Sequence, residues 1–294
     1  MVHSWILENS RWQMAISSRG AEMRSLTEKT ADRQWLWQPD DRVWKSTAPL
    51  LFPVVGRLVH NGLWDDENFY PLPAHGFLRN QAFALLQHTP TTLRLINRAS
   101  KETLRVWPFM YSVQVDYTLL ESGVRISWRV MNQDSKPLCF SLGYHPGFAL
   151  PLSNTSGWRV VFSEADTMGP FYTRDRTLSL AQPAGSVREF ALTPETFCDG
   201  AVYFAGCQGA RVSVVSPEGR TVLQCQLTSQ PWIALWGVPG ADLLCIEPLS
   251  GTTDAPDASG QQRDKRGMQW LAAGAAYQQE LDIIFPADGV QRDG

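Results

Sequence analysis

Three short stretches of the chain place an ionisable side chain among glycine, proline and aromatic residues. His75 stands in LPAHGFLRN, His145 stands in GYHPGF, and Glu247 stands in CIEPLSG. In each stretch a strand-like pattern ends at the ionisable residue, and a glycine or proline then forces a turn. A side chain in this position is aimed into a cleft while the sheet holds its backbone rigid. The three residues are therefore candidates for proton-transfer chemistry.

The residue types suit an acid and a base, although each has a plainer interpretation. An imidazole titrates near neutral pH, so His145 is a candidate acid; alternatively it is a structural histidine that bonds a loop carbonyl. Glu247 follows the apolar run LLCI, and partial burial there raises the basicity of its carboxylate. Alternatively it is a buried glutamate paired with an arginine. His75 has a similar alternative, and none of the three decides the question alone.

Taken together, the stretches resemble the aldose 1-epimerase family, whose members are galactose mutarotase-like. The resemblance includes FPVVGRL at residues 52–58 and extends from about residue 10 to about residue 285. It implies an all-β fold, a large antiparallel β-supersandwich of the galactose mutarotase type. It also implies an isomerase that opens and recloses sugar rings without a cofactor. The expected partner is therefore a small-molecule sugar.

The resemblance implies a role for each matching residue. His145 would be the general acid that protonates the ring oxygen, and Glu247 the general base that takes the proton from the anomeric hydroxyl. His75 would be the second histidine, on the ring-oxygen side. Arg57 would contact sugar hydroxyls, and Asp199, in FCDGA, would match the substrate-binding aspartate. We expect the acid and the base to act from two sides of the sugar and to come from separate strands.

Two stretches depart from the pattern of the galactose-specific members. Those members usually carry a longer Asn-Arg pattern after the glycine and His-Gly-Gly at the second histidine. This chain has Gly56-Arg57-Leu58 and His75-Gly76-Phe77 instead. The difference points away from galactose and toward the less characterised branch of the family.

Two other functions are compatible with the same residues. A hexose-6-phosphate 1-epimerase shares a stretch of the LPAHGF type and would need a basic pocket, for which Arg57, Arg79 and Lys265 are available. A non-catalytic sugar-binding protein on the same fold is the second alternative, because fold does not determine function. A pure binder needs no acid–base pair, so the presence of both His145 and Glu247 favours an enzyme.

Alternation with a period of two residues predicts the strands that would position these side chains. Apolar residues occupy every second position in 111–119 and again in 124–130, which predicts a hairpin with one buried face. A second hairpin is predicted around the turn SPEG at 216–219. Further strands are predicted at residues 4–7, 12–17, 92–96, 158–162, 232–236, 243–247 and 277–285.

Many short strands without a sustained helical stripe predict a large antiparallel sandwich, formed as a single domain over residues 1–294. The segment 251–266 is polar and rich in turn residues, so we expect a long surface loop. Within it, Asp254 and Asp257 are interpreted as solvated turn residues and 264–266 as a solvated charge run.

The composition disfavours several partners. The net charge of −3 gives no electrostatic reason to expect nucleic acid or an anionic membrane. The five cysteines are widely spaced and resemble small buried hydrophobes rather than disulfide or zinc ligands, and no cluster has metal-ligand spacing. No signal peptide or membrane helix is evident, so we expect a cytoplasmic protein that is a monomer or homodimer. Of the twelve tryptophans, we expect most in the core and a few on a cleft wall.

Overall fold

The long hairpin predicted from alternation is present in the computed structural model, which describes residues 2–153, 157–182 and 184–286. Strand β10 (Tyr111–Leu120) pairs with β11 (Gly123–Asn132) in antiparallel register along its whole length. The apolar residues at alternate positions of both strands are buried in the core. The prediction of a hairpin with one buried face is confirmed.

This hairpin lies within a nine-stranded antiparallel sheet. The second predicted hairpin is β20 and β21, and strand β25 joins it to β11. In spatial order around β11 and β10, the other strands are β18 (Glu189–Ala191), β15 (Arg159–Phe162), β20 (Arg211–Val215), β21 (Thr221–Leu227), β25 (Ala276–Ile284), β9 (Thr92–Arg98) and β8 (Ala84–His88).

A second layer consists of an eight-stranded and a four-stranded sheet. The eight-stranded sheet has the order β17 (Gly185–Ser186), β16 (Met168–Tyr172), β19 (Val202–Ala205), β22 (Trp232–Trp236), β23 (Leu243–Leu249), β13 (Gly143–Tyr144) and β5 (Leu50–Leu51), with β14 (Gly147–Ala149) also paired to β23. The four-stranded sheet is β1 (Ser4–Glu8), β2 (Trp12–Ser17), β3 (Met23–Glu28) and β4 (Arg33–Gln34). Two small pairs are β6 (Gly62–Asp65) with β7 (Asn68–Pro71) and β12 (Leu138–Phe140) with β24 (Gln269–Leu271).

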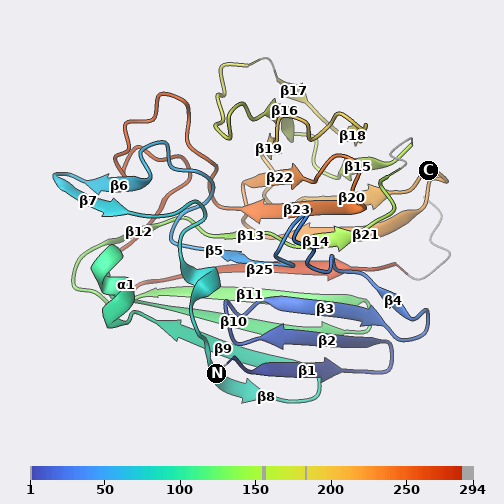
Figure 1. The fold of residues 1–294 in the computed structure, drawn as a ribbon, viewed down its shortest axis with the longest axis horizontal. Coiled ribbons are helices and arrows are strands. Elements are labelled where there is room, and N and C mark those ends of the chain that lie inside the picture. Colours follow the sequence, from blue (N-terminus) through green and yellow to red (C-terminus); the bar gives the residue numbers. More distant parts are fainter. Residues whose placement is uncertain (1, 154–156, 183, 287–294) are drawn as a thin grey trace.

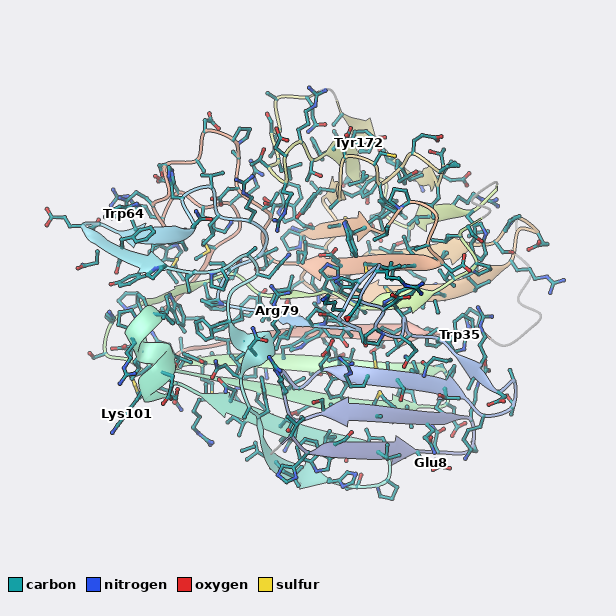
Figure 2. The ribbon with its side chains drawn as sticks, viewed as in Figure 1. Glu8, Trp35, Trp64, Arg79, Lys101 and Tyr172 are labelled. Atoms are coloured by element: carbon teal, nitrogen blue, oxygen red, sulfur yellow. The ribbon has the colours of Figure 1, made fainter. Side chains whose placement is uncertain are left out.

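The core lies where the two layers face each other. Figure 1 shows the four-stranded sheet over β9–β11 and shows β22 and β23 over the other half of the nine-stranded sheet; Figure 2 shows the side chains that fill the structure. The ring of Trp128 on β11 lies 5.2 Å from that of Tyr144 on β13. Likewise, Phe162 on β15 lies 4.7 Å from Phe204 on β19. Face-to-face packing of this kind confirms the predicted antiparallel supersandwich.

Two short helical segments interrupt the strands, although the sequence shows no helical stripe. The helix α1 (Lys101–Val106) has six residues, fewer than two turns, so a 3.6-residue period has no room to appear. Its first turn is closed by reciprocal bonds between Ser100 and Thr103, a capping box with threonine at the position where glutamate is usual. The other segment is the 3-10 turn η1 (Leu78–Asn80). Across the described ranges, no helix combines the length and apolarity needed to cross a membrane.

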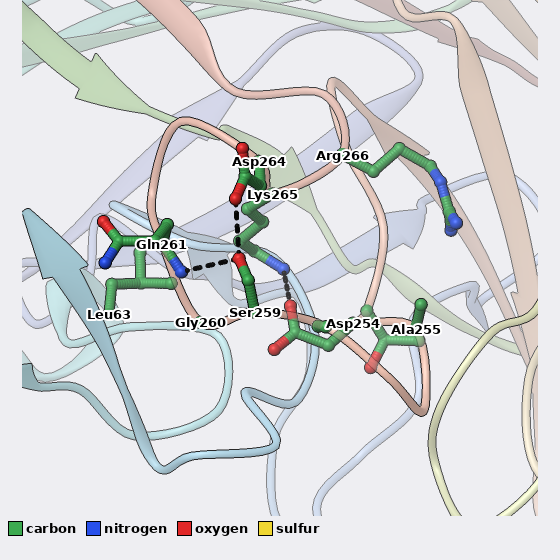
Figure 3. Close-up of a pocket in the computed structure, with 11 residues that line it drawn as sticks. Leu63, Asp254, Ala255, Ser259, Gly260, Gln261, Asp264, Lys265 and Arg266 are labelled. Carbon is green, nitrogen blue, oxygen red and sulfur yellow. Dashed lines mark hydrogen bonds and ion pairs between the residues drawn. The ribbon is translucent and has the colours of Figure 1, made fainter. Parts of the chain in front are cut away.

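The loop 251–266 contains a buried ion pair that its polar composition does not predict. Asp254 and Lys265 are only 5% and 8% exposed and form an ion pair of 2.8 Å, visible in Figure 3. The other Asp254 oxygen accepts the Val59 N–H, and the Lys265 ammonium also donates to the Thr252 carbonyl. The interpretation of these two charges as solvated is therefore wrong, because distant backbone groups and each other replace water. Asp257, by contrast, is exposed as expected.

This buried pair holds the loop against the segment that carries Arg57. The Asp254 N–H donates to the Arg57 carbonyl at 3.1 Å, and the Arg57 N–H donates to Thr253 Oγ1 at 3.0 Å. At Gly56, with a φ of 76°, a Cβ would lie 2.3 Å from the Thr253 Cα. Only glycine permits this close approach, so loop and segment are positioned together.

We predict that Lys265→Met destabilises the protein by about 3–5 kcal/mol, because it leaves the Asp254 carboxylate buried without its partner. Urea denaturation followed by circular dichroism measures the change. Arg263→Met is the matched control: it removes a cation of the same loop from an exposed pair with Asp66, a change worth less than about 1 kcal/mol. Equal losses in the two variants would contradict a structural role for the buried pair.

Candidate active site

The outer face of the eight-stranded sheet forms the floor of a cavity. Along β19, β22 and β23, side chains alternate between the core and the opposite face. Core-facing residues are Val202, Phe204, Ile233, Leu235, Leu244 and Ile246. The alternate positions Tyr203, Trp236 and Glu247 line a cavity of about 450 Å³. Both faces of β23 are covered, which explains why all seven of its residues are buried.

The register of β23 brings His145 opposite Glu247. Strands β13 and β14 both pair with β23, through Gly143 opposite Leu249 and Gly147 opposite Cys245. The same register continued between them places His145 across from Glu247. Because proline has no N–H, Pro146 interrupts the ladder here, but its carbonyl still accepts the Ile246 N–H at 3.3 Å. The His145 Nε2 lies 3.1 Å from the Glu247 Oε1.

Two expectations about this pair need correction. The sequence indicates a strand that ends at Glu247, but β23 continues to Leu249, so the carboxylate projects from the middle of a strand. We also expected the acid and the base on two sides of a bound sugar. They instead stand side by side in direct contact, Glu247 on β23 and His145 in the break between β13 and β14. Among the residues that the structure describes, Glu247 has no arginine partner, and its contact is with His145.

Burial controls the protonation of the pair. The side chains of His145 and Glu247 are only 10% and 5% exposed. Burial lowers the pKa of His145 to about 3, with a contribution from the charge of Arg79, and it raises the pKa of Glu247 well above its usual range. Each group therefore favours its uncharged form. A single proton between Nε2 and Oε1 satisfies both atoms.

Aromatic rings hold the imidazole of His145 in place. Trp44 stacks on it with ring centroids 4.9 Å apart and an interplanar angle of 25°. Trp236 meets it edge-on at 5.7 Å, and both indoles line the cavity. The expectation that a few tryptophans lie on a cleft wall agrees with this placement. Within the described ranges the Nδ1 of His145 has no hydrogen-bond partner, so the ring is held by stacking and by Glu247.

His75 also lines the cavity, in a turn that fixes its tautomer. The Gly56 N–H donates to the His75 Nδ1 at 3.2 Å, and the His75 N–H donates back to the Gly56 carbonyl at 2.9 Å. Nδ1 is thus an acceptor, and the neutral ring carries its proton on Nε2. Burial, with the nearby charges of His145, Arg79 and Arg176, lowers the pKa of His75 well below its usual range. Its ring centroid lies 5.8 Å from that of His145.

The turn at His75 and Gly76 has an unusual backbone conformation. Both residues have positive φ, 65° at His75 and 69° at Gly76. A Cβ on Gly76 would lie 2.2 Å from the Phe52 carbonyl oxygen. The second position therefore requires glycine.

Two further predicted site residues differ in their placement. Arg57 lines the cavity, and its Nη1 donates to the Asp175 carbonyl at 2.7 Å. Asp199 is exposed and does not line the cavity; only the two residues that follow it, Gly200 and Ala201, do. Its carbonyl accepts a bond from the Thr173 hydroxyl. The structure thus brings His75, His145, Glu247 and Arg57 together at the cavity, and the Asp199 side chain lies outside the lining.

Several residues that line the cavity have no role in the catalytic site expected from the sequence, where Arg79 was offered only for the basic pocket of the phosphate-sugar alternative. Arg79 follows His75 by four positions and lies on η1, near the middle of the view in Figure 2. Its place in the LPAHGFLRN stretch, beside His75, is the signal that ties it to this cavity. Arg176 lies in a turn with no sequence signal, and Trp44 and Tyr203 resemble ordinary core aromatics. Lys265 lines a smaller neighbouring cavity of about 130 Å³, shown in Figure 3.

An acid–base pair with one proton between its members, beside indole faces and hydrogen-bond donors, is suited to proton transfer on a polar ring. Residues 3–283 match the family model Aldose 1-epimerase, so the chain belongs to the aldose 1-epimerase family. The resemblance inferred from the motifs is confirmed.

Individual relatives agree with this assignment. A galactose mutarotase related enzyme from Lactobacillus acidophilus is 27% identical, with a TM-score of 0.91 over 99% of this chain and 100% of that chain. A galactose mutarotase-like protein from Lactobacillus casei ATCC 334 is 25% identical, with a TM-score of 0.87 over 97% and 100%. The chromosomal Protein LacX of Lactococcus lactis subsp. lactis is 23% identical over 280 residues, which are 88% of this chain and 91% of that protein.

The depressed pKa of His75 has a consequence for stability. The folded protein keeps this ring neutral, whereas the unfolded chain protonates it below about pH 6.5. The unfolded state therefore binds more protons in acid, and the contribution of His75 to the free energy of unfolding falls by up to about 1.4 kcal/mol per pH unit below that point. The stabilisation is present at neutral pH and is lost as the pH falls.

We predict that His75→Asn reduces this acid sensitivity. Asparagine tolerates positive φ and offers an oxygen to the Gly56 N–H, so the turn is preserved. Urea unfolding at about pH 7.5 and about pH 5.5 should show a loss of stability that is about 1 kcal/mol larger in the wild type than in the variant. His3→Asn, which removes an exposed histidine, is the control. A variant with the same loss as the wild type would show that His75 is protonated in the folded state.

Proposed function

We propose that this protein is an aldose 1-epimerase that interconverts the α and β anomers of a sugar. The observation that carries the proposal is the contact between His145 and Glu247 on the wall of a cavity. The cavity volume of about 450 Å³ lies in the range of small-molecule sites. Family membership supports the same reaction class, an isomerisation of a sugar.

The proposed reaction begins with the proton that the pair shares. When that proton is on His145 Nε2, Glu247 is a carboxylate and His145 is an imidazolium, with no change in the net charge of the pair. The carboxylate takes the proton from O1 while the imidazolium protonates the ring oxygen, and the C1–O5 bond breaks. The open-chain aldehyde rotates, and the steps in reverse close the ring on its other face. Each group supplies on the order of 10²–10⁴ in rate.

Side-by-side placement of the two groups suits this chemistry. O1 and the ring oxygen are both bonded to C1, so adjacent acid and base can reach them from one wall. The neutral His75, with its Nε2–H, would donate to the sugar on the ring-oxygen side. Arg57 would bond hydroxyl groups, and the indole faces of Trp44 and Trp236 would pack on the apolar C–H face of the ring.

A non-catalytic sugar-binding protein is the alternative from another class. The contact between His145 and Glu247 favours the enzyme, because binding alone does not require two buried ionisable groups in contact. Every step above uses the chain's own side chains, and we propose a reaction without a cofactor. The free cysteines, four of them buried, are consistent with the cytoplasmic location that we propose.

We predict that Glu247→Gln and His145→Gln each slow anomerisation by on the order of 10²–10⁴. Polarimetry on freshly dissolved α-anomers of free and phosphorylated sugars measures the rate above the spontaneous one. Glu218→Gln, in the exposed turn between β20 and β21, is the matched control and should keep the wild-type rate. Circular dichroism verifies that each variant is folded.

Two outcomes of these measurements would contradict the proposal. If no sugar equilibrates faster with the wild-type protein than without it, the protein is not an epimerase of those sugars. If Glu247→Gln retains a rate within about tenfold of the wild type, Glu247 is not the base.

A further inference from the structure

The lining of the cavity that contains the His145–Glu247 pair is predominantly positive in charge. Three arginines line it: Arg57, Arg79 and Arg176. Among the described residues that line it, Glu247 is the single carboxyl group, and burial favours its uncharged form. The lining therefore carries an excess of positive charge, and the nearby carboxylate of Glu22, which acts on Arg79, lies outside it.

The partners of these arginines leave both their charge and most of their donors available. Arg57 and Arg79 each donate one bond to a backbone carbonyl, that of Asp175 and of Ala74. Across residues 2–153, 157–182 and 184–286, none of the three arginines forms an ion pair, and the Arg176 side chain has no hydrogen bond. Since a guanidinium has five N–H donors, each arginine retains several for a ligand.

The arginine charges act on the catalytic side of the cavity. The field of Arg79 contributes to the low pKa of both His145 and His75, and the fields of Arg176 and Lys265 contribute to that of His75. Positive charge from η1 and from the turn at 173–177 therefore converges on the space that a ligand would fill. Lys265, which the sequence offered as a third cation, lines the separate smaller cavity, and Arg176 takes that place instead.

We propose that the substrate of this site is a sugar that carries an anionic group, a phosphate or a carboxylate, bound by Arg57, Arg79 and Arg176. This inference rests on the proposed function, because it assumes that the anomeric carbon lies at His145 and Glu247. Guanidinium groups bind the oxygens of phosphate and carboxylate through paired N–H donors. A neutral hexose would offer these three guanidinium groups no negative charge.

Binding is tested separately from catalysis with the Glu247→Gln protein. Calorimetric titrations use glucose 6-phosphate, glucuronate and glucose as probes, and the two charged probes distinguish a phosphate from a carboxylate. We expect a charged sugar to bind tighter than glucose, with an affinity that decreases as salt increases. Adding the Arg176→Gln substitution should weaken the affinity for the charged sugar roughly ten- to hundredfold and leave the affinity for glucose unchanged. Arg174→Gln, an exposed arginine of the same turn outside the cavity lining, is the matched control.

The results separate this inference from the proposed function. Charged sugars that bind no better than glucose, or an Arg176→Gln variant that binds them as well as the Arg174→Gln control, overturn the inference, even if neutral aldoses are epimerised. Arginine-dependent binding of a charged sugar supports it, even if polarimetry on the wild-type protein detects no epimerisation.

Discussion

The site depends on one constraint, the register in which β23 pairs with β13 and β14. Because Gly143 and Gly147 are each held against β23, the residue between them must face Glu247. A slip of one residue would turn Glu247 into the core and Ile246 into the cavity. The core-facing residues of β22 and β23 oppose such a slip, since the slip would expose them. Hydrophobic packing on one face of the sheet thus sets the chemistry on the other.

Burial on the outer face of the eight-stranded sheet makes the His145–Glu247 pair suited to proton transfer. Trp44 stacks on His145, Thr253 lines the same cavity, and the side chains of His145 and Glu247 are only 10% and 5% exposed. Desolvation disfavours a charge on either group, and sharing one proton is the arrangement that satisfies both. Ala234 lies opposite Glu247 and opposite Tyr203 on the neighbouring strands, so the smallest side chain of this row stands between the two larger ones. Room for a ligand and burial of the pair therefore come from the same sheet.

Parts of the structure that depend on local pattern were predictable, and parts that depend on distant partners were not. Alternation predicted β10, β11, β2 and β22 because each strand shows one face to the core. The helix α1 was missed because six residues are too few for a helical period. Asp254 and Lys265 were predicted to be solvated because their neighbours in sequence are polar. Their burial depends on the 55–59 segment, whose Val59 N–H bonds Asp254 across 195 positions.

The sequence by itself determined the all-β class, most strand positions, the family, and the ionisable residues His75, His145 and Glu247. The tertiary structure alone decided that His145 and Glu247 touch, that Arg79 and Arg176 join them, and that the Asp199 side chain lies outside. The physical reason is that periodicity reports which face of a strand is buried, while a cavity is formed by loops from separate parts of the chain. Their meeting is set by the packing of whole sheets, which no local pattern records.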